Sequence, residues 1–133
     1  MSPATGQVPR ALRVLVVDDE AAFERPFARM LRPHEARFFA DPRAALAHLR
    51  EDPSYDVVLC DVRMPEMMGT ELHEEVAREH PELGARFVFL TGGAFSPETR
   101  DYLERTGSQQ LLKPFERKTM LAAVEAAASA AAD

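Results

Sequence analysis

Three aspartates, a threonine and a lysine stand at the ends of apolar segments of the sequence. Asp18 and Asp19 follow the first segment, and Asp61 follows the third. Thr91 and Lys113 end the fourth and the fifth. Three carboxylates held close together repel one another, and the usual remedy is a hard divalent cation with oxygen ligands, here Mg²⁺. A carboxylate can also be a nucleophile toward phosphorus, while a hydroxyl and an ammonium group attract phosphoryl oxygens. These residue types predict a magnesium-dependent phosphoryl-acceptor site.

The five residues meet only if the segments before them are parallel strands of one sheet. Apolar and β-branched runs predict strands at 13–17, 35–40, 55–60, 86–90 and 110–112. Amphipathic helical stretches alternate with them, which implies right-handed crossovers and helices on both faces of a doubly wound α/β sheet. Ligands bind at the carboxyl ends of the strands in such a sheet. We therefore expect the polar residues to converge there.

Local signals place several helix starts and inner faces. A capping side chain followed by proline predicts helices beginning at Pro42 and at Pro97, the latter ending near residue 105. Proline is costly in a helix interior, so the first helix should either begin near residue 22, with Pro26 in its first turn, or kink at Pro26. The final helix, from about residue 115, is expected to bury Leu121 and Val124.

Length and composition bound the remaining possibilities. The chain has 133 residues, of which 46% are hydrophobic and 29% charged, as expected for one globular domain. A net charge of -6 argues against nucleic acid and anionic membranes as partners. No apolar run is long enough to span a bilayer, and the first residues do not resemble a secretory signal. We expect a flexible segment at 1–11, one domain at 12–129 and a tail at 130–133, too short for an output domain.

One cysteine and four histidines have no assigned chemistry. Cys60 excludes an internal disulfide and a cysteine-cluster metal site, which suits the cytoplasm. Its position within an apolar strand predicts a small core residue. The histidines at 34, 48, 73 and 80 are expected at the surface.

Four separated motifs are recognisable in the sequence. They are VVDDE at 16–20, DVRMP at 61–65 followed by Gly69, TG at 91–92, and KPF at 113–115. In this order and spacing, covering about residues 12–129, the chain resembles the receiver domains of two-component response regulators. The loop at 106–110 is most similar to that of receivers fused to hybrid sensor kinases. The resemblance implies a flavodoxin-like fold of five βα units with strand order 2-1-3-4-5.

The resemblance also implies individual roles. Asp61 would be the phosphoacceptor, and Asp18 and Asp19 would bind Mg²⁺ together with Asp61 and the backbone carbonyl of Arg63. Lys113 would pair with the phosphoryl group and be followed by a cis peptide bond.

Four positions concern the response to phosphorylation. By the same resemblance, Thr91 would move to hydrogen-bond the phosphoryl group and draw its loop inward. Receivers usually carry an aromatic residue at the position of Gln110, so this chain departs from the usual switch. Arg63 and Gly93 occupy the two positions that the resemblance links to the rate of dephosphorylation.

The implied function is a cytoplasmic receiver in a bacterial two-component pathway. A sensor histidine kinase or phosphotransfer protein would donate the phosphoryl group, and the modified domain would change its contacts with a downstream protein effector. The chain would modify itself and not turn over a separate substrate as an enzyme does. Two alternatives stay open: a receiver-fold binding module that signals without phosphorylation, and a Mg²⁺-dependent phosphohydrolase with an aspartyl nucleophile.

Overall fold

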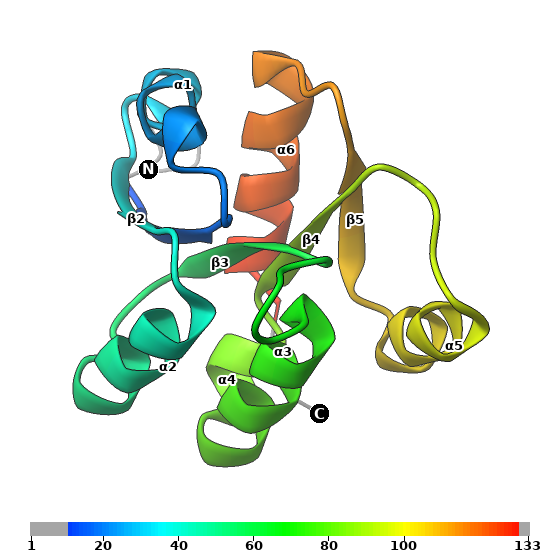
Figure 1. Cartoon of the computed structure of the whole chain (residues 1–133). Coiled ribbons are helices and arrows are strands. Elements are labelled where there is room, and N and C mark those ends of the chain that lie inside the picture. Colours follow the sequence, from blue (N-terminus) through cyan, green and yellow to red (C-terminus); the bar gives the residue numbers. More distant parts are fainter. Residues whose placement is uncertain (1–10, 131–133) are drawn as a thin grey trace.

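The computed structural model describes residues 11–130, which form a sheet covered by helices on both faces (Figure 1). All neighbouring strands pair in parallel, and their order is β2-β1-β3-β4-β5, as expected. The strands are β1 (Arg13–Val17), β2 (Glu35–Phe39), β3 (Val57–Asp61), β4 (Phe87–Thr91) and β5 (Gln109–Leu112). The terminal segments expected at 1–11 and 130–133 lie, except for residues 11 and 130, outside the described part.

Among the described residues, six α-helices and one 3-10 helix lie between and after the strands. They are η1 (Ala21–Phe23), α1 (Glu24–Leu31), α2 (Pro42–Glu51), α3 (Gly69–Glu79), α4 (Pro81–Gly84), α5 (Pro97–Thr106) and α6 (Arg117–Ala128). Helices α1 and α6 cover one face of the sheet, and α2, α3, α4 and α5 cover the other (Figure 1). The short helix α4 was not expected: Pro81 ends α3, as predicted, but then begins a further turn.

The two faces of the sheet contribute to two separate hydrophobic cores. Leu15 and Val17 belong to the core beneath α2 and α3, whereas Val14 and Val16 belong to the core beneath α1 and α6. Successive side chains of a strand point to opposite faces. A strand buried on both faces must therefore be apolar throughout, which explains the continuous hydrophobic runs.

The helix starts follow the sequence signals. Asp41 accepts a hydrogen bond from the backbone N–H of Arg43 (3.0 Å), and Ser96 accepts one from that of Thr99 (3.2 Å). Pro26 lies in the first turn of α1 because η1 precedes it. These caps fix where the loops at the carboxyl ends of β2 and β4 enter their helices.

The inner face of α6 differs from the prediction. Met120, Val124 and Ala127 are its buried residues, whereas Leu121 is partly exposed. The buried positions recur at intervals of four and three residues, as on one face of a helix. Leu121 lies one position beyond that stripe.

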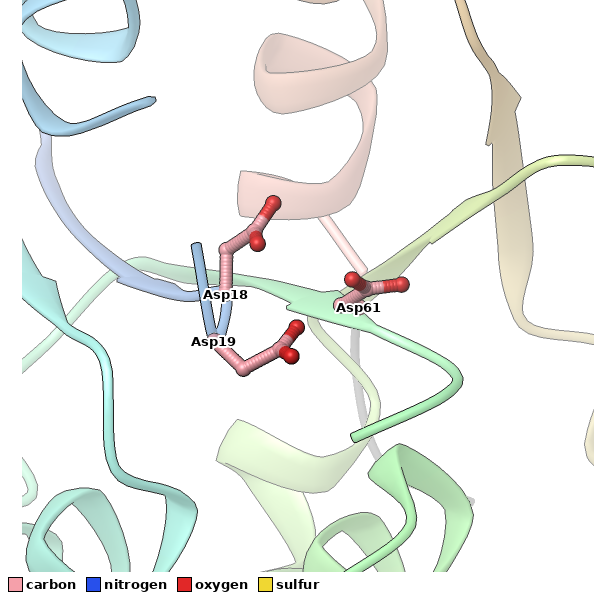
Figure 2. A group of neighbouring side chains, drawn as sticks. All are labelled: Asp18, Asp19 and Asp61. Carbon is pink, nitrogen blue, oxygen red and sulfur yellow. The ribbon is translucent and has the colours of Figure 1, made fainter. Parts of the chain in front are cut away.

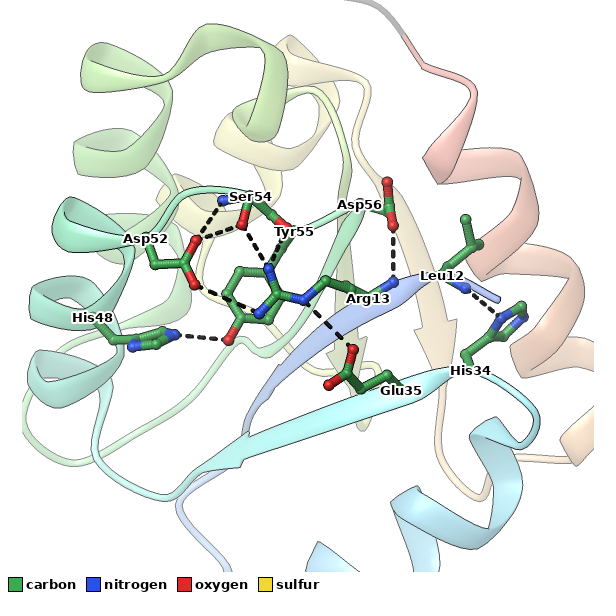
Figure 3. A network of polar contacts seen from close by, with 9 residues as sticks. All are labelled: Leu12, Arg13, His34, Glu35, His48, Asp52, Ser54, Tyr55 and Asp56. Atoms are coloured by element: carbon green, nitrogen blue, oxygen red, sulfur yellow. Dashed lines mark hydrogen bonds and ion pairs between the residues drawn. The ribbon is translucent and has the colours of Figure 1, made fainter. Parts of the chain in front are cut away.

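A polar network joins the amino ends of β1, β2 and β3 (Figure 3). The backbone N–H of Arg13 donates to Asp56 (2.8 Å), and its guanidinium group lies 3.6 Å from the carboxylate of Glu35. His34 accepts a hydrogen bond from the backbone N–H of Leu12 (3.0 Å) and is 8% exposed. The predicted surface position of this histidine was therefore wrong, because its ring satisfies a buried backbone donor.

The carboxyl end of α6 also lies at the amino ends of the strands. Arg86, which directly precedes β4, donates from Nε to the carbonyl of Ala130 (3.1 Å).

Among the described residues, no helix combines the length and the hydrophobicity needed to cross a membrane.

Candidate functional site

The three aspartates gather where β1 and β3 end (Figure 2). Each offers a carboxylate oxygen, and these oxygens lie within 4.8 Å of one another. Asp18 is fully buried and Asp61 is 7% exposed, whereas Asp19 is exposed to solvent. Residues 43 positions apart in the sequence, Asp18 and Asp61, meet because β1 and β3 are neighbours in the sheet.

Asp18 has one oxygen in use and one without a partner. Its Oδ1 accepts a hydrogen bond from the backbone N–H of Glu20 (3.0 Å), while its buried Oδ2 has none among the described residues. Burial, aided by the nearby charge of Asp61, raises the pKa of Asp18 from 3.8 to about 6. A buried carboxylate oxygen without a donor is costly, so this oxygen is available to an added cation.

Lys113 provides the positive charge at this edge. Its Nζ lies 3.5 Å from Oδ2 of Asp61, and its side chain is 31% exposed. Burial raises the pKa of Asp61, and the charge of Lys113 and the backbone N–H of Arg63 act against that shift. The peptide bond between Lys113 and Pro114 is cis, as the resemblance implied.

Thr91 is buried at the end of β4 with its hydroxyl oxygen engaged in its own loop. The backbone N–H of Gly93 donates to this oxygen (2.8 Å), and the carbonyl of Thr91 accepts from the backbone N–H of Lys113 (2.9 Å). Gly93 has φ +97°, a conformation that favours glycine. The loop from residue 92 to Ser96 therefore connects the site directly to the start of α5.

Gly69 lies in close contact with the end of β3 that carries Asp61. A Cβ atom at this position would lie 2.1 Å from the carbonyl oxygen of Asp61 and 3.1 Å from Sγ of Cys60. The first residue of α3 thus has to be glycine for the helix to approach the strand end that carries Asp61. The sequence motif contains Gly69, but its role depends on a contact that spacing alone does not reveal.

A pocket of about 360 Å³ lies over these groups. Its lining includes Asp19, Asp61, Thr91 and Lys113, and also Arg63, Gly92 and Ala94. Asp18 lies beneath as the buried member of the acidic cluster. The structure therefore brings together the predicted nucleophile, acidic pair, hydroxyl and lysine.

The residues that the resemblance links to switching and to the rate of dephosphorylation lie around the pocket. Gln110 is exposed on β5, paired in register with Phe89 of β4. Gly93 lies in the loop above β5, where an added Cβ would contact the exposed side chain of Leu112 at 3.4 Å. Arg63 is exposed at the rim.

The donor set fits a divalent metal such as Mg²⁺. Carboxylate oxygens are the ligands this ion prefers, and three of them converge here. The unpartnered oxygen of Asp18 is one of the atoms that an ion would satisfy.

Comparison with known families agrees with this geometry. The model of the response regulator receiver domain matches residues 14–125. The chain belongs to the receiver domain family of two-component response regulators. The expected resemblance is thus confirmed over nearly the whole described part of this receiver.

Related proteins carry receivers in different contexts. This receiver is 32% identical to the two-component response regulator ARR11 of Arabidopsis thaliana over 87% of this chain and 22% of ARR11. It is 35% identical to the transcriptional regulatory protein PdtaR of Mycobacterium tuberculosis over 95% of this chain and 60% of PdtaR. A hybrid signal transduction histidine kinase of Dictyostelium discoideum is 26% identical over 77% of this chain and 8% of its own length. The chain therefore spans between 8% and 60% of these relatives, which include plant as well as bacterial proteins.

Solved structures show the same fold. The chemotaxis protein CheY4 of Vibrio cholerae superposes on this receiver with a TM-score of 0.76 and 29% identity. The match covers 89% of this chain and 99% of CheY4.

Proposed function

We propose that this receiver is a phosphorylation-dependent switch in which Asp61 accepts a phosphoryl group. The observation that carries the proposal is the convergence of Asp61 with two further aspartates and Lys113 at one edge of the sheet. The donor would be a sensor histidine kinase or a phosphotransfer protein. A hybrid histidine kinase among the relatives supports this class of donor.

The transfer step uses the carboxylate of Asp61 as nucleophile. One of its oxygens forms the new O–P bond while the P–N bond to the donor's histidine breaks, and the electron pair leaves with the imidazole nitrogen. Lys113 opposes the rise in the pKa of Asp61 that burial causes, which favours the ionised nucleophile. The same ammonium group is placed to attract phosphoryl oxygens.

Asp18, Asp19 and Asp61, with the backbone carbonyl of Arg63, would hold Mg²⁺. When bound, the ion would offset the negative charge of the carboxylates and of the phosphoryl oxygens. Asp18 contributes the buried oxygen without a partner, and Asp19 contributes an exposed carboxylate at the mouth.

Phosphorylation adds close to two negative charges, and Thr91 responds to them. Its hydroxyl would donate to the phosphoryl group, and the loop that now donates to its oxygen from Gly93 would rearrange. That loop leads into α5, so the surface of α5, β5 and α6 would change its contacts with a downstream protein effector. Arg63 and Gly93 would set how fast water removes the phosphoryl group.

The acidic net charge of -6 favours protein partners over nucleic acid or a membrane surface. We place the receiver in the cytoplasm, where histidine kinases present their phosphoryl groups, and assign it no turnover of a separate substrate.

The experiment is labelling by acetyl phosphate with Mg²⁺, followed on a phosphate-affinity gel and by intact mass. We expect wild type to gain one phosphoryl group, Asp61→Asn to gain none, and Asp101→Asn, which changes an exposed carboxylate of α5, to behave as wild type. Decay of the labelled band then gives the dephosphorylation rate.

Three results would contradict the proposal. Equal labelling of Asp61→Asn would move the acceptor elsewhere. Absence of labelling, with amide spectra unchanged by beryllofluoride and Mg²⁺, would favour a binding module independent of phosphorylation. Sustained release of phosphate over many turnovers would instead indicate a phosphohydrolase.

A further inference from the structure

Few side chains of α5 are buried against the rest of the domain. Thr99 and Leu103 are its buried residues. Tyr102, which is partly buried, reaches across to α3, and its hydroxyl oxygen lies 2.5 Å from Nδ1 of His73. Together with the packing of Leu103 in the core, this side-chain hydrogen bond holds the helix against α3.

His73 is fixed in place at the other end of that bond. It is 5% exposed, contrary to the predicted surface position, and its Nε2 lies 2.9 Å from the carbonyl of Gly84. A carbonyl only accepts, so Nε2 carries the hydrogen and Nδ1 accepts from the hydroxyl of Tyr102. Its ring also packs edge-on against Phe87 and Phe89, with centroids 4.8 and 5.6 Å away. His73 therefore cannot follow Tyr102 if α5 moves.

The start of α5 is tied to the phosphoryl-acceptor site. Ser96 caps the helix through the backbone N–H of Thr99, and the loop before it begins at Thr91. Because the oxygen of Thr91 accepts from the backbone N–H of Gly93, movement of this hydroxyl toward a phosphoryl group pulls on the loop or breaks that contact. Motion of the loop then displaces the helix start.

A helix transmits such a displacement along its axis. Tyr102 lies six residues beyond Ser96, about 9 Å along a helix. Hydrogen bonds between oxygen and nitrogen keep a narrow range of distances and weaken steeply outside it. A shift of Tyr102 away from His73 by more than about 1 Å therefore breaks its bond to the immobile ring.

We propose that the Tyr102–His73 hydrogen bond holds α5 in its unphosphorylated position and opposes the change that occupation of Asp61 requires. The proposal rests on the switch proposed above and assigns Tyr102 and His73 as positioning residues within it. By linkage, loss of the bond lowers the cost of the rearrangement and so strengthens binding of a phosphoryl mimic.

The test is a titration with beryllofluoride in saturating Mg²⁺, followed by amide NMR. We expect Tyr102→Phe to bind about twofold to tenfold more tightly than wild type, the range that a single net hydrogen bond supports. Hydrogen exchange without beryllofluoride should also be faster at the backbone amides of residues 101–106. That second measurement reports the fastening of α5 in the resting domain.

Tyr55→Phe is the matched control. Tyr55 also bonds a histidine through its hydroxyl, 2.7 Å from Nε2 of His48, but this bond joins the segment before β3 to α2 and does not involve α5 (Figure 3). It should leave affinity and α5 exchange unchanged.

The possible failures are distinguishable. Equal or weaker binding by Tyr102→Phe, with wild type binding normally, overturns the role of the bond and leaves the switch intact. If wild type itself does not bind beryllofluoride, both proposals fall. An equal gain of affinity in Tyr55→Phe also overturns the inference, because the effect would then be a general loosening.

Discussion

The ammonium group of Lys113 lies 3.5 Å from a carboxylate oxygen of Asp61, although 52 residues separate them in the sequence. Strand β4 lies between β3, which carries Asp61, and β5, which ends one residue before Lys113. Lys113 reaches across the end of β4, where Thr91 stands, and so closes the site from the side opposite Asp18. A single side chain thereby balances part of the charge of the buried acidic cluster.

Removal of that charge should slow phosphorylation. In Lys113→Met the pKa of Asp61 rises, because Lys113 now acts against the effect of burial, and phosphoryl oxygens lose a cationic partner. We expect the initial labelling rate with acetyl phosphate to fall on the order of a hundredfold. Lys118→Met removes an exposed lysine of α6 and is the control. If the initial labelling rate of Lys113→Met stayed within about twofold of the wild-type rate, Lys113 would be dispensable for phosphorylation.

Asp18→Asn should stabilise the metal-free domain. Burial holds the pKa of Asp18 at about 6 instead of 3.8, a cost of about 2 to 3 kcal/mol when the group is ionised at neutral pH. Asparagine keeps the acceptor for Glu20 and removes the charge. Chemical denaturation at pH 7.5 without divalent ions measures this gain.

Addition of Mg²⁺ should make the wild-type domain more stable than Asp18→Asn. Wild type should gain stability in millimolar Mg²⁺ through preferential binding to the folded state, while Asp18→Asn should gain little. A variant less stable than wild type in the absence of the ion would contradict the assigned cost of the buried carboxylate.

Substitution at Gly69 should damage the fold near Asp61. A Cβ 2.1 Å from the Asp61 carbonyl forces strand and helix apart, and we expect Gly69→Ala to lose about 3 kcal/mol of unfolding free energy. At Gly92 an added Cβ meets nothing within 4 Å. Urea denaturation of Gly92→Ala should thus give a value within about 0.5 kcal/mol of wild type, and equal losses in both variants would refute the steric explanation.

The buried histidine of α3 should make stability depend on pH. Burial lowers the pKa of His73 below 6.5, its ordinary value. Below pH 6.5 the unfolded chain therefore binds a proton that the folded chain excludes, so stability falls as pH decreases, by up to about 1.4 kcal/mol per pH unit. The raised pKa of Asp18 has the opposite sign, costing stability as pH rises from 3.8 toward 6.

The contribution of His73 is isolated by subtraction. Denaturation curves of wild type and His73→Gln, measured from pH 7.5 to 5.5, should differ in slope, with the steeper acid loss in wild type. Parallel curves would mean that His73 takes up its proton equally in both states.

The sequence predicted the sheet and the polar residues at its edge because both follow from local patterns. Strands buried on both faces require continuous apolar runs, and parallel connections bring their carboxyl ends together. Asp18, Asp61 and Lys113 could therefore be assigned to one place before their separation was known.

The contacts that depend on three-dimensional packing were not predicted. His73 is polar and was assigned to the surface, yet Gly69, Leu72, His73 and Val76 are the buried residues of α3. Leu72, His73 and Val76 lie three, four and seven residues after Gly69, the spacing of one helix face. These positions, taken without regard to polarity, predict a buried His73. The partner Tyr102 follows from the packing of α5 on α3, which no local pattern specifies.

The bond from Arg86 to the carbonyl of Ala130 fixes the direction in which the chain leaves α6. Arg86 precedes β4 and Thr91 ends it, so the full length of that strand separates Ala130 from the acidic pocket. A fluorophore or a surface tether attached at Ala130 would lie at the amino ends of the strands, away from the pocket. Immobilised in this way, the domain would present its pocket to a kinase in solution without obstruction.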